Sequence, residues 1–105
     1  MERIRFPLTT SRFRNDFRAL NMNKIIISEF SIVQDLLMNK KEFPLKYKDH
    51  LLTGNYKNHR ECHLRPDMLL IYRVIDTMEI DKESNKYITY VEFVRIGSHS
   101  KLFGG

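Results

Sequence analysis

The stretch YKDHLLTGNYKNHRECHLRPDMLLIY, from Tyr47 to Tyr72, contains the clearest strand patterns of the chain and three of its four histidines. Polar and apolar residues alternate from Tyr56 to Arg65, with Cys62 and Leu64 on one face, which predicts a strand. The nearly continuous apolar run from Met68 to Ile75 is typical of a central strand covered on both faces. A proline turn separates these two strands, so we expect them to pair antiparallel.

The residues before this stretch predict one strand and two helices. Near the N-terminus, alternating apolar residues indicate a short strand with one buried face: Ile4, Phe6 and Leu8. Candidate N-caps follow at Thr9 to Ser11, and then Phe13, Phe17 and Leu20 recur at helical spacing. A second helix is expected from about Lys24 to Lys40, with an apolar stripe of Ile26, Phe30, Val33 and Leu37.

The C-terminal third completes the predicted sheet. The polar segment from Asp81 to Lys86 indicates a turn, and Tyr87 to Ile96 is typical of a strand that Gly97 ends. The sequence therefore predicts a single α+β domain over residues 1–105, in the order β-α-α-β-β-β. In this fold a helical hairpin packs on a mainly antiparallel, twisted sheet.

Composition limits the environment and the partners. The chain has 105 residues and a formal net charge of +5, which favours polyanionic partners such as nucleic acid, although an ordinary basic surface remains an alternative. One cysteine excludes an intramolecular disulfide and fits a reducing cytoplasm. No apolar run approaches the roughly 20 residues of a membrane span, so we expect a soluble cytoplasmic protein without a membrane partner.

The histidine-bearing segments predict an RNA-cleaving site. Metal-free RNA cleavage needs a base for the 2′-hydroxyl proton, an acid for the 5′-oxygen leaving group and a cation for the phosphate. We assign the acid to His99 or His50 and the base to Asp67 or His63. The cation is Arg95, because its guanidinium can bind phosphate oxygens in pairs. The products would be a 2′,3′-cyclic phosphate and a 5′-hydroxyl.

Several motifs, in order and at matching spacing, resemble the YafQ branch of the RelE/ParE toxin superfamily. They are Tyr47-Lys48-Asp49-His50, Leu52-x-Gly54, Arg60-Glu61-Cys62-His63-x-x-Pro66-Asp67, Leu70-Ile71-Tyr72 and Arg95-x-Gly97-Ser98-His99-Ser100-x-Leu102-Phe103. The resemblance covers nearly the whole chain. It implies a RelE-like fold and a toxin of a type II toxin–antitoxin pair. That toxin would be a ribosome-dependent endoribonuclease that cuts mRNA, and a RelB/DinJ-like antitoxin would hold it inactive.

The resemblance also implies which residues act. The family's catalytic positions fall on His50, His63, Asp67, Arg95, His99 and Phe103. Phe103 would stack on a base. Many relatives have tryptophan after the aspartate, where this chain has Met68, which stacks less well on a base.

Met68 is expected to contact RNA, and basic residues around the histidines are expected to contact RNA phosphates. They are Lys46, Lys48, Lys57, Arg60 and Arg65.

Each candidate also has a purely structural interpretation. His63 could be a solvent-exposed residue of a strand, and His50 could cap a turn. Asp67 could be only a turn residue, and Phe103 could anchor the tail in the core. His59 fits a surface residue or an RNA contact. Arg95 could pair with Glu92 or Glu61, and Cys62 is expected to be a small buried residue.

We expect no cofactor and no metal, because the candidate groups include no carboxylate cluster for magnesium and the cysteine–histidine spacing matches no standard zinc finger. Two other functions stay open: a non-enzymatic inhibitor like the gyrase-poisoning ParE members, and a catalytically degenerate RNA-binding module.

Overall fold

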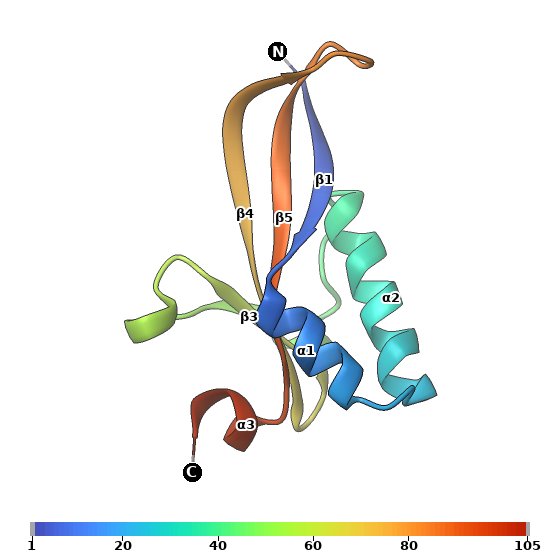
Figure 1. Cartoon of the computed structure of the whole chain (residues 1–105), viewed down its shortest axis with the longest axis vertical. Helices are drawn as coiled ribbons and strands as arrows, with labels where there is room; N and C mark the ends of the chain where they lie inside the picture. Colours follow the sequence, from blue (N-terminus) through green and yellow to red (C-terminus); the bar gives the residue numbers. More distant parts are fainter. Residues whose placement is uncertain (1, 105) are drawn as a thin grey trace.

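A mixed five-stranded sheet, in the order β1-β5-β4-β3-β2, organises the computed structural model, which describes residues 2–104. β1 runs parallel to β5, and the other neighbouring strands are antiparallel (Figure 1). The elements are β1 (Arg3–Thr9), α1 (Ser11–Ala19), α2 (Lys24–Met38), β2 (His50–Leu51), β3 (Arg60–Arg65), β4 (Met68–Asp81), β5 (Lys86–Gly97) and α3 (His99–Phe103). This arrangement confirms the predicted α+β class and the order of the main elements.

The two long helices begin where their caps predict. The Thr10 hydroxyl accepts a hydrogen bond from the Phe13 amide at 3.0 Å, and Asn23 caps α2 in the same way. α2 ends at Met38, two residues before the predicted Lys40, because Lys40 adopts a left-handed conformation with φ of 57°.

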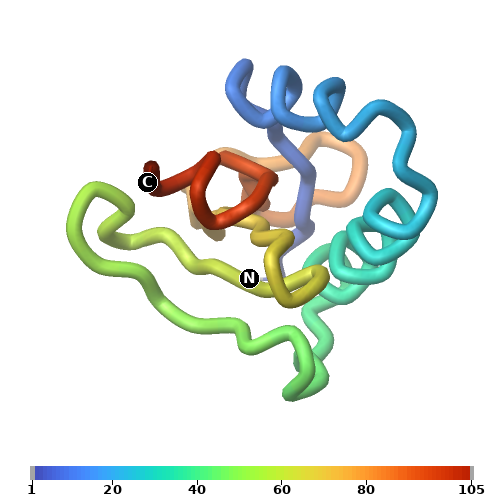
Figure 2. Tube along the Cα trace, turned by 90° about the horizontal axis from the view of Figure 1, so that it is seen from below, coloured from blue at the N-terminus to red at the C-terminus, as the bar shows by residue number. Residues whose placement is uncertain are grey.

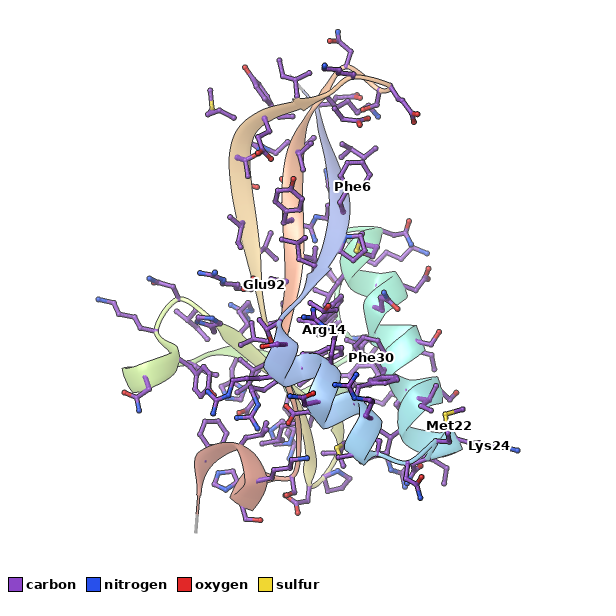
Figure 3. All side chains as sticks on the ribbon, viewed as in Figure 1. Phe6, Arg14, Met22, Lys24, Phe30 and Glu92 are labelled. Atoms are coloured by element: carbon purple, nitrogen blue, oxygen red, sulfur yellow. The ribbon has the colours of Figure 1, made fainter. Side chains whose placement is uncertain are left out.

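The main core lies between these helices and one face of the sheet. The centroid of the Phe30 ring of α2 lies 5.5 Å from that of Phe13 in α1 and 5.2 Å from that of Phe93 in β5 (Figure 3). A second, smaller cluster covers the opposite face of β4, where Leu69 and Ile71 pack against Leu102 of α3. The central strand is therefore buried on both faces, as its apolar run predicts.

The segment from Leu45 to Tyr56 differs most from expectation. Its part from Leu45 to Asn55 has no periodic pattern and is expected to be a loop, but it contains β2, flanked by two 3-10 turns, Leu45–Tyr47 and Gly54–Tyr56. The strand expected from Tyr56 begins only at Arg60, as β3. β2 is only two residues long, so no periodic pattern could reveal it. It pairs His50 with Glu61 and Leu51 with Arg60, which adds a fifth strand to the sheet.

The hairpin of β4 and β5 is longer than predicted. β4 continues past Ile75 to Asp81, and the paired strands extend beyond the helices, so that the molecule measures 44 Å along its longest axis (Figure 1). No helix within residues 2–104 is long and apolar enough to cross a membrane.

Candidate functional site

Two histidines flank a buried carboxylate on β2 and β3. His50 lies opposite Glu61 in the antiparallel pair, and His63 follows Glu61 by two residues, so all three side chains project from the same face. The Nε2 atoms of His50 and His63 each lie 3.4 Å from Glu61 Oε1. Glu61 is only 6% exposed, although strand alternation predicted a polar, outward-facing side chain. The site therefore contains a carboxylate that can orient both imidazoles.

The same three residues have the geometry of a metal-binding group. One donor atom from each of His50, Glu61 and His63 lies within 4.8 Å of the others, and imidazole with carboxylate suits a divalent transition ion. Cys62, the cysteine considered in the sequence-based zinc alternative, has an inaccessible side chain in the main core. Burial strongly raises the pKa of its thiol, so Cys62 is a neutral core residue.

His50 also makes the turn contact that its structural interpretation predicts, because its Nδ1 atom lies 2.7 Å from the Lys48 carbonyl oxygen. This contact leaves Nε2 facing Glu61, so it orients the ring without removing the histidine from the site.

Arg95 belongs to the same face of the sheet. Glu61 pairs with Ile71, and Ile71 pairs with Arg95, so Arg95 lies two strand spacings, about 10 Å, from Glu61 along one cross-strand row. Its guanidinium binds neither Glu92 nor Glu61, the partners considered from the sequence. Instead, Nε and Nη2 donate to the two oxygens of Asp16 at 2.7 and 3.0 Å.

α1 brings Asp16 to this position because β1 ends at Thr9 and leaves the edge of β5 open beyond Phe93. The Asp16 carboxylate also accepts from the Ile96 amide of that edge at 3.1 Å. The hydrogen bond to Asp16 is the main cause that raises the pKa of Arg95, so the guanidinium is a fixed, permanent cation.

The tail folds into α3 and places His99 and Phe103 beside the sheet. The Asp67 Oδ1 atom accepts a hydrogen bond from the His99 amide at 2.9 Å, which ties α3 to the turn between β3 and β4. Leu102 is the buried anchor at 7% exposure, whereas Phe103 is 40% exposed and packs 5.1 Å from the His99 ring. Phe103 is therefore not the core anchor of its structural interpretation. Figure 2 shows α3 close to the loop that follows β2.

Only some of the predicted RNA-contacting residues lie beside the histidines. Lys46, Lys48 and Arg65 line a cleft of about 310 Å³ that also includes His63. Lys57 is exposed on the loop after β2, but Arg60 donates two hydrogen bonds to Asp49 Oδ2 at 3.0 and 2.8 Å. Met68 is half-buried against the core and lines a separate depression with Arg65 and Asp67.

A family model for YafQ, a bacterial toxin of a type II toxin–antitoxin system, matches residues 5–104. The chain belongs to the YafQ toxin family.

Relatives of this YafQ-family chain include an mRNA interferase toxin YafQ from Escherichia coli, 28% identical over 96 residues, or 90% of this chain and 91% of the relative. Two solved structures are also similar. YafQ in an E. coli DinJ–YafQ complex has a TM-score of 0.72 and 29% identity, covering 95% of this chain and 99% of that one. A metal-bound toxin from Helicobacter pylori has a TM-score of 0.69 and 37% identity, covering 98% and 100%.

In this YafQ-family chain, sequence reasoning missed two acidic residues of the site. Glu61 is part of a quoted motif but was expected to point outward from its strand. Its position opposite His50 is known only from the structure, because it depends on the short strand β2. Asp16 lies 79 residues before Arg95, and no sequence pattern singled it out. Neither carries a local signal, because both act through partners that folding alone brings close.

Proposed function

We propose that this YafQ-family chain is a ribosome-dependent endoribonuclease that cuts mRNA by attack of a 2′-hydroxyl on the adjacent phosphate. The observation that carries the proposal is the shared sheet face: His50, Glu61 and His63 lie on it in register with the fixed cation of Arg95. His99 lies at the start of α3, where its amide donates to the Asp67 carboxylate in the turn between β3 and β4. These groups supply the acid, the base and the phosphate ligand that metal-free cleavage requires.

The structure favours some roles within this scheme. His63 lies against the buried Glu61, and a carboxylate that orients an imidazole suits a general base. Asp67 already accepts the backbone hydrogen bond that holds α3, so it also acts as a positioning residue for His99. His99, on an exposed and short helix, is then the preferred acid, with His50 as the alternative. Phe103 would stack on a base beside His99.

The proposed partners follow from the family and from the charge of the site. DinJ binds YafQ in the E. coli complex, and we infer that this chain likewise has a cognate antitoxin of the DinJ type. An acidic segment of that antitoxin would compete with mRNA for the cleft of Lys46, Lys48 and Arg65. Ribosome and mRNA place the proposed reaction in the bacterial cytoplasm.

Mapping of mRNA ends tests the proposal against the inhibitor and RNA-binding alternatives. Ribosome-bound mRNA is incubated with the protein, and new 5′-hydroxyl ends are located. His63→Ala and His99→Ala should each lower the cleavage rate by about 10²- to 10⁴-fold, because general acid–base groups contribute that much. Lys82→Ala is the control and should keep the rate of the unmodified protein, because Lys82 is exposed in the turn between β4 and β5. Unchanged rates for His63→Ala and His99→Ala would refute the catalytic assignment.

We further propose that a divalent transition ion at His50, Glu61 and His63 inhibits cleavage. The donor atoms suit such an ion, and the similar Helicobacter pylori toxin is metal-bound. An ion there would take the imidazole lone pairs that proton transfer needs. Zinc chloride should therefore slow cleavage, and the zinc-selective chelator TPEN, with the magnesium that ribosomes need left in place, should restore it, while TPEN alone leaves the rate of metal-free protein unchanged. Loss of cleavage on addition of TPEN alone would contradict both the inhibitory role and metal-free chemistry.

A further inference from the structure

A second cleft lies between α1, the loop after β2, and α3. It has a volume of about 450 Å³, within the size range of small-ligand sites. Its lining residues come from four separate segments, α1, the loop after β2, β5 and α3: Arg12, Thr53, Asn55, Tyr56, Arg95, Leu102 and Phe103. Of these residues, only Arg95 and Phe103 belong to the site predicted from the sequence. The other lining residues have no assigned role.

Two guanidinium groups border this cleft. Asp16 binds Nε and Nη2 of Arg95, which fixes the side chain and leaves Nη1 outside that ion pair. Arg12 lies four residues before Asp16, so both project from the same face of α1. Arg12 is exposed and makes no ion pair or side-chain hydrogen bond within residues 2–104. The cleft thus has one fixed and one movable guanidinium, and guanidinium groups form strong charge-assisted hydrogen bonds with phosphate.

Two aromatic rings form the other side of the cleft. The Tyr56 and Phe103 rings have centroids 5.9 Å apart and planes at 85°, and Phe103 is 40% exposed. His99 packs on Phe103 at 5.1 Å, so the cleft adjoins a candidate catalytic group. Exposed aromatic faces beside cations are the usual elements of single-strand nucleic-acid binding.

We propose that this cleft binds one nucleotide of single-stranded RNA, with a phosphate between Arg12 and Arg95 and the base against Tyr56 and Phe103. This subsite rests on the proposed function, because it extends the same RNA-binding face. The cleft of Lys46, Lys48 and Arg65 lies beside His63, and Arg95 shares the cross-strand row of Glu61. The RNA strand therefore crosses the sheet face between the two clefts, past the histidines.

Binding of 2′-O-methyl hexaadenylate, which lacks the attacking hydroxyl, tests the subsite without cleavage. Fluorescence anisotropy of a labelled hexamer gives Kd at several salt concentrations. Arg12→Ala should raise Kd several-fold and lower the salt slope by about 0.7, since one phosphate contact is lost. Tyr56→Ala should raise Kd about five- to a hundredfold, and Tyr56→Phe should restore most binding, because stacking needs only the ring.

Arg14→Ala is the matched charge control. Arg14 occupies the same helix but donates to the Thr9 carbonyl and hydroxyl and does not line the cleft. It should keep the Kd and the salt slope of the unmodified protein. Equal losses for Arg12→Ala and Arg14→Ala would show general charge attraction and overturn the subsite. Circular dichroism of each variant excludes loss of folding.

Two further measurements separate the subsite from other outcomes. If the unmodified protein cuts ribosome-bound mRNA while Arg12→Ala and Tyr56→Ala bind and cut normally, the subsite is wrong and the proposed function stands. If the unmodified protein does not cut but the variants lose hexamer binding as expected, the subsite stands and the proposed function fails. If hexaglutamate binding depends on Arg12 and hexamer binding does not depend on Tyr56, the cleft serves an acidic protein segment and the RNA subsite is overturned.

Discussion

Asp16 and Arg95 form the one ion pair within residues 2–104 whose two side chains are both nearly buried, at 6% and 10% exposure. Removal of one partner would leave the other charge uncompensated in the interior, which typically costs about 3–5 kcal/mol. Asp16→Ala should therefore lower the free energy of unfolding by about 3 kcal/mol or more in urea titrations. Glu83→Gln, an exposed change in the turn between β4 and β5, is the control and should cost less than about 0.5 kcal/mol. A similar effect of the two changes would contradict a buried, unsolvated pair.

The same carboxylate gives the fold a predictable pH dependence. Burial by itself raises the pKa of Asp16, but hydrogen bonds from Arg95 and the Ile96 amide, with the charge of Lys101 nearby, outweigh it and hold the pKa below the ordinary 3.8. A carboxyl group whose pKa is lower in the folded than in the unfolded protein contributes its full stabilisation at pH values above its pKa in the unfolded protein. That stabilisation is lost as the pH falls through the folded pKa.

The unfolding free energies of the unmodified protein and Asp16→Asn should thus differ by a constant amount from pH 7 to 5, and the difference should shrink below about pH 4. Urea titrations at half-unit pH steps measure this difference. A gap that stays constant down to pH 2.5 would show that Asp16 does not titrate with a depressed pKa.

At the scale of the element, α3 depends on a close approach to β5. A Cβ atom at Gly97 would lie 3.2 Å from Lys101 Cδ and 3.3 Å from Leu102 Cδ2. The lysine side chain can move, but Leu102 is anchored in the small cluster with Leu69 and Ile71. A Cβ atom at position 97 therefore requires Leu102 to move by a few tenths of an ångström, and the branched side chain of valine is expected to displace α3, with His99 and Phe103, further from the sheet.

Gly97→Val should consequently reduce mRNA cleavage by at least about tenfold while lowering the unfolding free energy by only about 1–2 kcal/mol. Cleavage mapping and urea titration on the same sample check both values. Ser100→Ala, an exposed change within α3, is the control and should preserve both activity and stability. Full activity of Gly97→Val would mean that the position of α3 does not matter for the reaction.

At the scale of the whole molecule, positive charge is distributed unevenly with respect to the site. Lys46, Lys48 and Arg65 surround the cleft beside His63, whereas Lys40 lies near the start of β1, where its Nζ atom contacts the Arg3 carbonyl at 3.4 Å. Replacing the first three by glutamine should weaken ribosome binding and reduce its logarithmic salt slope by about 2, or about 0.7 for each lost phosphate contact.

The charge-matched control replaces Lys40 and Lys41, which follow the C-terminal end of α2, and Lys82, in the turn between β4 and β5; none of the three lines the cleft beside His63. This triple variant has the same net charge but should keep the salt slope of the unmodified protein. Sedimentation of protein with ribosomes at 50–300 mM salt provides the comparison, about the range over which counterion release is visible. Equal slopes for both triple variants would show that net charge alone drives the association.

Much of the fold was determined by local patterns. The apolar run after Pro66, the helical spacing of Phe13 and Phe30 in their helices, and the cap at Thr10 each specify a structure within a few residues. Family motifs also identified the histidines and Arg95 as candidates. These features are accessible from sequence because hydrophobic periodicity and capping act over one or two turns of chain.

Tertiary structure alone decided how those candidates are held. The two-residue strand β2 exists only because β3 offers it a partner, and it is what places His50 against Glu61. The choice of Asp16 as the partner of Arg95 depends on where β1 ends and leaves the edge of β5 open to α1. Neither contact has a sequence signal. The contact of His50 with Glu61 depends on the register of β2 against β3, and the contact between Asp16 and Arg95, 79 residues apart, depends on the packing of α1 against β5, which no short window of sequence contains.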